Sequence, residues 1–125
     1  MSNKKSFSIQ ARLKSFIFAF AGLKTFFRTE HNSWIHVIAA ITAITLGIIL
    51  KINDYQWCLI IIVISLVIMA EIINTAIEKL VDMVSPQYSE MAKKVKDMGA
   101  AAVLVAAITA LCVGVIIFIP KLFNY

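Results

Sequence analysis

Residues 66–84 have the sequence LVIMAEIINTAIEKLVDMV, in which a purely apolar segment changes into a charged one. The fourteen residues before Glu71, from Trp57 to Ala70, contain nothing more polar than a cysteine and a serine. A helix needs about 20 apolar residues to cross a membrane, so Glu71 comes before such a span is complete. The sequence therefore predicts a transmembrane helix that carries a carboxylate inside the membrane, near one of its faces.

Glu71 shares one side of this predicted helix with three other polar residues. They are Asn74, Glu78 and Asp82, at the spacings of three and four residues that align side chains along a helix. A charge inside the membrane costs roughly 3 kcal/mol or more, and such residues usually mark function. We therefore interpret Glu71 and Asn74 as part of a site. Alternatively, Glu71 pairs with a neighbouring helix, and Glu78, Asp82 and Glu90 are solvated charges at the interface.

The composition is typical of a membrane protein with one domain. Of the 125 residues, 61% are hydrophobic, and the mean hydropathy is +0.88. A soluble domain has about 45–50% apolar residues. The net charge of +5 does not indicate nucleic-acid binding, because the basic residues are scattered with few aromatic residues among them outside the N-terminal segment. We predict one integral-membrane domain over residues 1–125, with no nucleic-acid partner.

The expected fold class is all-α, with one amphipathic surface helix and three transmembrane helices. Residues 7–28 carry six of the eight phenylalanines among basic residues, a composition typical of a helix that lies on the membrane surface. The predicted transmembrane helices are residues 31–50, 57–78 and 98–119. A hydrophilic loop is expected at about 82–97, and Pro120 is expected to end the third transmembrane helix.

The basic residues also predict how the chain is oriented. Ten of the 12 lysines and arginines come before the first span or between the second and third, and two lie on the other side. Cytoplasmic loops are enriched in these residues. The N-terminus and the 79–97 loop are therefore expected to face the cytoplasm, which places the acidic side chains where nucleotides are available.

Acidic residues from three predicted elements come to this membrane face. Glu30 precedes the first span, Glu71 and Glu78 lie on the second, and Asp97 follows Lys96 at the start of the third. Mg²⁺ typically binds one or two carboxylates together with substrate phosphates. Lysine suits phosphate oxygens, and a deeper carboxylate suits a general base. These are components of phosphoryl transfer, although the sequence contains no glycine-rich P-loop.

Two histidines lie near the start of the first predicted span. His31 and His36 are five residues apart, and no further metal ligand stands close to them in the sequence. We therefore interpret both as polar packing residues rather than as a metal-binding pair.

Three segments carry a resemblance to a known family. Glu71–Glu78 is EIINTAIE, residues 79–82 are KLVD, and residues 96–104 are KDMGAAAVL. This pattern resembles the prokaryotic diacylglycerol kinases, which are small integral-membrane lipid kinases. The resemblance covers nearly the whole chain, including Ala21-Gly22-Leu23 of the surface helix and the junction at Glu30.

The resemblance implies a role for each candidate residue. Glu71 would be the catalytic base, and Asn74 would keep its surroundings in order. Glu30 and Glu78 would bind the Mg²⁺ that bridges the phosphates of ATP. The residues that it implies at the nucleotide are Lys96, Asp97, Gln87, Tyr88 and Ser89. It also implies a homotrimer in which neighbouring subunits share each active site.

The expected function is ATP-dependent phosphorylation of a membrane lipid alcohol, in the cell (inner) membrane. Diacylglycerol, which would give phosphatidic acid, is the first expected substrate, because residues 97–104 look like the enteric diacylglycerol kinases. Undecaprenol is the second, because residues 30–36 look like the undecaprenol kinase branch and His36 stands where the enteric enzymes have an acid. A rival of another class is a non-enzymatic oligomer that conducts protons or ions past Glu71.

Overall fold

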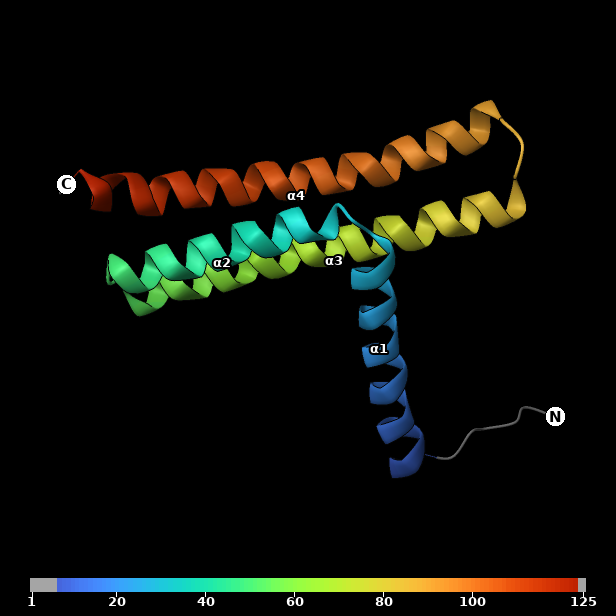
Figure 1. The fold of residues 1–125 in the computed structure, drawn as a ribbon, viewed down its shortest axis with the longest axis horizontal. Coiled ribbons are helices and arrows are strands. Elements are labelled where there is room, and N and C mark those ends of the chain that lie inside the picture. The colour runs from blue at the N-terminus through green and yellow to red at the C-terminus, as the bar shows by residue number, and fades with distance from the viewer. Residues whose placement is uncertain (1–6, 124–125) are drawn as a thin grey trace.

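The chain forms four α-helices in a computed structural model, which describes residues 7–123. The helices are α1 (Ile9–Thr29), α2 (Ser33–Ile49), α3 (Asp54–Val84) and α4 (Glu90–Leu122). Helices α2, α3 and α4 run along one direction, whereas α1 turns away from α2 by 103° (Figure 1). The described part of the chain is therefore all-α, as the sequence predicts.

Two of the helices are long and apolar enough to cross a membrane. Helix α3 has 31 residues and α4 has 33. At 1.5 Å per residue they are about 46 and 50 Å long, which exceeds the roughly 30 Å of a bilayer's hydrocarbon core. Helix α2 has only 17 residues and reaches the length of a span only together with α1 across their bend. The protein is thus a membrane protein with two or three candidate spans.

The connection between α3 and α4 differs from the expected loop at 82–97. Helix α3 continues to Val84 and α4 already begins at Glu90, so residues 85–89 alone connect them. The polar residues around this connection extend both helices beyond their apolar parts, because a charged helix surface is compatible with water. Pro120 does not end α4 either, since the helix continues to Leu122.

Polar caps fix where the two long helices begin. Asn53 and Gln56 form a capping box before α3: Asn53 Oδ1 accepts from the Gln56 amide at 2.9 Å, and Gln56 Oε1 accepts from the Asn53 amide at 3.0 Å. At the start of α4, Ser89 Oγ accepts from the Ala92 amide at 3.3 Å. The caps define the first turns, and the helical repeat then sets the direction of each later side chain.

Few side chains are buried within the chain itself. The largest buried cluster consists of Ile52, Ile60, Ile117 and Phe118, at the end where α2 joins α3. Most large apolar residues of the helices face outward and are exposed. Such a surface would be an aggregation hazard in water, but it suits lipid tails or neighbouring subunits as its surroundings.

Helix α1 contributes little to this core. Phe26 is its one buried residue within the described chain, whereas Phe16 and Phe20 are 64% and 69% exposed. The rings of Phe27 and Trp34 lie 6.2 Å apart between centroids and pack across the corner between α1 and α2. Helix α1 is thus directed across the other helices and carries exposed aromatic side chains.

Candidate active site

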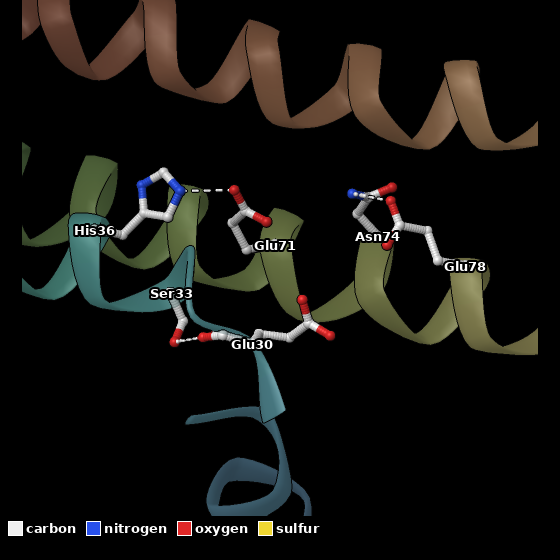
Figure 2. A network of polar contacts seen from close by, with 6 residues as sticks. All are labelled: Glu30, Ser33, His36, Glu71, Asn74 and Glu78. Carbon is white, nitrogen blue, oxygen red and sulfur yellow. Dashed lines mark hydrogen bonds and ion pairs between the residues drawn. The ribbon is translucent and has the colours of Figure 1, made fainter. Parts of the chain in front are cut away.

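Polar side chains gather where the corner between α1 and α2 meets the middle of α3 (Figure 2). They come from the corner, from the first turn of α2 and from two successive turns of α3. The members are Glu30, Ser33, His36, Glu71, Asn74 and Glu78. We refer to these six residues as the corner cluster.

Glu71 reaches across to α2 and contacts His36. His36 Nε2 lies 2.6 Å from Glu71 Oε1, and the two side chains are only 22% and 16% exposed. Glu71 therefore does pair with a neighbouring helix, as the alternative interpretation of the sequence expected. Sequence analysis interpreted His36 as a polar packing residue and did not predict Glu71 as its partner. The sequence could have indicated this pairing, because both residues lie a similar number of helical turns from the short connection between α2 and α3, and two helices joined in this way run side by side.

Asn74 and Glu78 form the second part of the corner cluster. Asn74 Nδ2 donates to Glu78 Oε1 at 3.4 Å, and Figure 2 shows the two side chains turned toward one another. Asn74 Oδ1 is buried and has no hydrogen-bond partner within residues 7–123. A buried amide oxygen without a partner is costly, which makes it a candidate acceptor for a group that binds here.

Gly99 of α4 provides the space for the Asn74 amide. A Cβ atom at position 99 would collide with Asn74 Oδ1. Because the colliding atom is the far end of a side chain, Asn74 would swing aside while the two helices stay packed. Gly99 is therefore the residue of the KDMG segment that acts directly on the corner cluster.

We expect Gly99→Ala to lower kcat by about 10- to 10²-fold, because small displacements of positioning groups have effects of this size. The melting temperature should change little, since only one side-chain end has to move. Gly22→Ala is the matched control, because nothing lies within 4 Å of a Cβ at that position. A Gly99→Ala enzyme with the kcat of the parent would show that the Asn74 orientation is irrelevant.

Glu30 is held at the corner by its own backbone. Its carbonyl oxygen accepts from the Ser33 amide at 3.1 Å and from Ser33 Oγ at 2.5 Å. One residue earlier, Thr29 Oγ1 accepts from Lys79 Nζ at 3.2 Å, which ties the corner to α3 next to Glu78. The side chain of Glu30 extends toward the part of α3 that carries Asn74 and Glu78 (Figure 2). The contact of Lys79 with Thr29 thus places the corner that precedes α2 beside the turn of α3 that carries Glu78.

The donor set fits a metal that arrives with phosphates, and not a site made by protein ligands alone. Within residues 7–123, no three histidine, cysteine or acidic side chains lie close enough to hold a metal ion. Mg²⁺ does not need such a cage, because it usually combines one or two carboxylates with phosphate oxygens and water. Glu30 and Glu78 supply that number.

The two neighbouring nucleotide candidates on α4 face different partners. Lys96 Nζ donates to Asp82 Oδ1 on α3 at 2.5 Å, whereas Asp97 Oδ2 accepts from Lys93 Nζ at 2.6 Å on α4 itself. The pairs are largely exposed, with Asp82 and Asp97 at 65% and 61%. Exposed ion pairs contribute roughly 0–1 kcal/mol, so phosphate groups can replace these partners at little cost.

The remaining nucleotide candidates lie apart from the corner cluster. Gln87, Tyr88 and Ser89 belong to the connection at residues 85–89, and Tyr88 is 80% exposed. The connection begins seven residues beyond Glu78, the nearest residue of the corner cluster on α3, which corresponds to about 10 Å along the helix. The structure therefore does not bring these three residues to the acids.

An apolar groove of about 290 Å³ leads from His36 between α2, α3 and α4. Alanines of α2 line it from Ala39 to Ala43, small residues of α4 line it from Ala107 to Gly114, and Phe118 lies at its far end. Within the described chain, His36 is the one polar side chain of this lining. The groove has the character of a site for a hydrocarbon chain whose polar end meets the His36–Glu71 pair.

Fold and site together define a small helical membrane protein with a carboxylate-rich site at the end of its spans. Residues 17–118 match the family model described as prokaryotic diacylglycerol kinase. The chain belongs to this family and is an ATP-dependent lipid kinase. Family membership overturns the rival interpretation as a non-enzymatic proton or ion pathway.

Relatives with two different named activities are similar to this chain. An undecaprenol kinase of Bacillus subtilis is 36% identical over 109 residues, which are 87% of this chain and 89% of the relative. A diacylglycerol kinase of Synechocystis is 37% identical over 113 residues, 90% of this chain and 65% of the relative. The diacylglycerol kinase of Escherichia coli K12 is 38% identical over 73 residues, 58% of this chain and 60% of the relative.

Proposed function

We propose that the chain, as one lipid kinase domain, transfers the γ-phosphoryl group of ATP directly to the hydroxyl group of a membrane lipid, with Glu71 as general base. The observation that carries this proposal is the 2.6 Å contact of Glu71 with His36 at the polar end of an apolar groove. Glu71 Oε1 contacts His36, and Glu71 Oε2, which has no hydrogen-bond partner within residues 7–123, would take the proton. A lipid whose chain lies in the groove would present its hydroxyl at this place.

The other residues of the site have separate proposed roles in phosphoryl transfer. Glu30 and Glu78 would hold Mg²⁺, which would supply positive charge against the ATP phosphates. Asn74 holds Glu78 through its amide and offers its free oxygen to a donor on the substrate. The candidates for nucleotide contacts are Lys96 and Asp97 on α4 and Gln87, Tyr88 and Ser89 in the connection.

The depth of Glu71 in the membrane can be inferred from where α1 contacts α3. With α1 on the cytoplasmic surface, its contact between Thr29 and Lys79 marks the interface on α3. Glu71 then lies about 12 Å deeper, at 1.5 Å per residue. Helices α2, α3 and α4 are the three spans, and the N-terminus and the tip between α3 and α4 face the cytoplasm. ATP is available on this cytoplasmic side of the inner membrane.

Diacylglycerol is the substrate that we propose first, in agreement with the relatives of Synechocystis and Escherichia coli. Undecaprenol is the second candidate. One observation that favours it is the similarity to the undecaprenol kinase of Bacillus subtilis. The other is that His36, which contacts Glu71, lies in residues 30–36, the segment that resembles undecaprenol kinases. Phosphatidic acid or undecaprenyl phosphate would be the product.

A side-by-side assay of the purified protein in micelles tests this proposal. Radiolabelled ATP is offered with diacylglycerol, with undecaprenol and without lipid, and the labelled lipids are separated by chromatography. We expect label in phosphatidic acid to exceed label in undecaprenyl phosphate. The reverse order would make undecaprenol the substrate, and label in neither lipid would contradict a kinase for these alcohols.

We also propose that the protein acts as a homotrimer with shared active sites. Its outward apolar surface suits neighbouring subunits. On α4, Lys96 faces its own α3 through Asp82, whereas Asp97 is 61% exposed and turned elsewhere. Asp97 of one subunit is thus available to the corner cluster of the next.

Mixing Glu71→Gln with Asp97→Asn subunits should restore activity that neither variant has alone, because hybrid trimers contain intact composite sites. Activity is measured after subunit exchange, which a tagged subunit verifies. Mixing Glu71→Gln with Glu30→Gln should restore nothing, because we propose that both residues act in the site of one chain, which the contact between Thr29 and Lys79 supports. Failure of the first mixture despite exchange would mean that each site is built within one chain.

A further inference from the structure

The first turn of α2 provides the side chain that holds Glu71. His36 lies three residues after the start of α2, immediately beyond the corner, and its ring lies against the Glu71 carboxylate on α3 (Figure 2). The contact of 2.6 Å is short even for a charge-assisted hydrogen bond. Within residues 7–123, His36 is the one hydrogen-bond partner of this carboxylate. What orients the proposed base is therefore a single donor.

The proposed role of Glu71 as general base fixes the direction of this hydrogen bond. A general base is ionised before it takes a proton, and an ionised carboxylate has only acceptor sites, so His36 Nε2 is the donor in the proposed reaction. Nε2–H donates to Glu71 Oε1, and Glu71 Oε2 remains free. An imidazole that donates through one nitrogen and whose ring is fixed by packing orients its acceptor, as histidine and acid pairs do in other sites.

We infer that His36 is a positioning residue for catalysis, which holds Glu71 so that Oε2 faces the hydroxyl group of the lipid. This inference rests on the proposed role of Glu71 as general base. As the lipid oxygen bonds to the γ-phosphorus, its O–H bond breaks and the proton passes to Glu71 Oε2. The bond from the γ-phosphorus to the bridging oxygen breaks, and ADP leaves with that electron pair. His36 keeps its own proton throughout and acts through Glu71.

The place of His36 in the groove supports this role. His36 is 22% exposed and lies where the lining changes from apolar side chains to the Glu71 carboxylate. A residue with a purely structural role would be replaceable by any side chain of similar size. A positioning residue must keep a donor at the location of Nε2, and this difference can be measured.

Two substitutions that introduce side chains of nearly equal length distinguish a positioning role of His36 from a purely structural one. His36→Gln keeps an N–H donor at about the distance of Nε2 from the backbone, whereas His36→Met fills similar space without a donor. We expect His36→Met to lower kcat by about 10-fold or more, with the KM for MgATP within about twofold of the parent. His36→Gln should recover most of the lost kcat. His36→Asn, whose donor lies nearer the backbone, should not.

A double variant tests whether His36 acts through Glu71. Once Glu71 is glutamine, adding His36→Met should lower the remaining kcat by less than about twofold, because coupled groups have non-additive effects. His31→Met is the matched control, since His31 is exposed at the same corner, and it should keep the kcat of the parent.

The inference is overturned if His36→Met keeps at least half of the parental kcat, or if His36→Met and His36→Gln lower kcat equally. If His36→Met does not fold, equal kcat values for His36→Gln and His36→Asn would overturn the inference instead. A normal kcat in Glu71→Gln alone would instead contradict the proposed base, which distinguishes the two failures.

Discussion

Replacing Glu71 by glutamine is expected to lower kcat at least ~10²-fold, because removing a proton in the transition state typically contributes 10²–10⁴-fold. A lipid hydroxyl is a poor nucleophile until it loses its proton. Glutamine has the size of glutamate and can still accept a hydrogen bond from His36, but it cannot take a proton. The loss therefore reports the chemical step and not the packing of α2 against α3.

The same variant should bind MgATP normally and fold at least as well as the parent. Its KM for MgATP should change little, because the proposed metal ligands Glu30 and Glu78 remain. Its melting temperature should not fall, since a carboxylate inside the membrane is costly and an amide is less so. Steady-state kinetics and thermal unfolding in one detergent measure both quantities.

Asp54→Asn is the matched control for this experiment. Asp54 is an exposed acid in the first turn of the same helix, more than four turns before Glu71. The control should keep kcat within about twofold, as surface changes usually have small effects. A kcat near the parental value in Glu71→Gln would contradict the base, and Asp97 would become the next candidate.

Replacing Glu78 or Glu30 by glutamine is expected to abolish activity at low Mg²⁺. Glu30 and Glu78 are the two carboxylates of the corner cluster that we propose as metal ligands, since Glu71 is the proposed base, so each substitution removes one of two anionic ligands. The Mg²⁺ concentration for half-maximal activity should rise about 10-fold or more, by comparison with other changes around metal sites. Titration of activity with Mg²⁺ at fixed ATP measures this shift.

Glu78→Gln should also disturb Asn74, whereas Glu30→Gln should not. Asn74 Nδ2 donates to Glu78 Oε1, and this bond weakens when the acceptor loses its charge. We therefore expect Glu78→Gln to lower kcat even at saturating Mg²⁺, and Glu30→Gln to be restored more completely. Asp54→Asn again serves as control. An unchanged Mg²⁺ dependence in both variants would remove these acids from the metal site.

The sequence by itself predicted an all-helical membrane chain and a polar face on α3. Apolar runs and helical spacing depend on local chemistry: a segment without charges favours lipid, and a 3.6-residue repeat sets which side chains share a face. The position of Glu71 on a long apolar helix, the helical spacing that it shares with Asn74 and Glu78, and the family could all be predicted in this way. The extent of α3 and α4 could not, because charged residues at 82–97 are compatible with either a loop or a solvated helix.

The contacts between helices were decided only by the tertiary structure. The pairing of His36 with Glu71, the space that Gly99 leaves for Asn74, and the bond from Lys79 to Thr29 all join residues far apart in the chain. Each depends on how far one helix is shifted and rotated against another. A helical repeat fixes neither quantity, because it describes one helix at a time. Packing at the α1–α2 corner and between α3 and α4 fixes both, and it thereby selects which of the predicted polar residues meet.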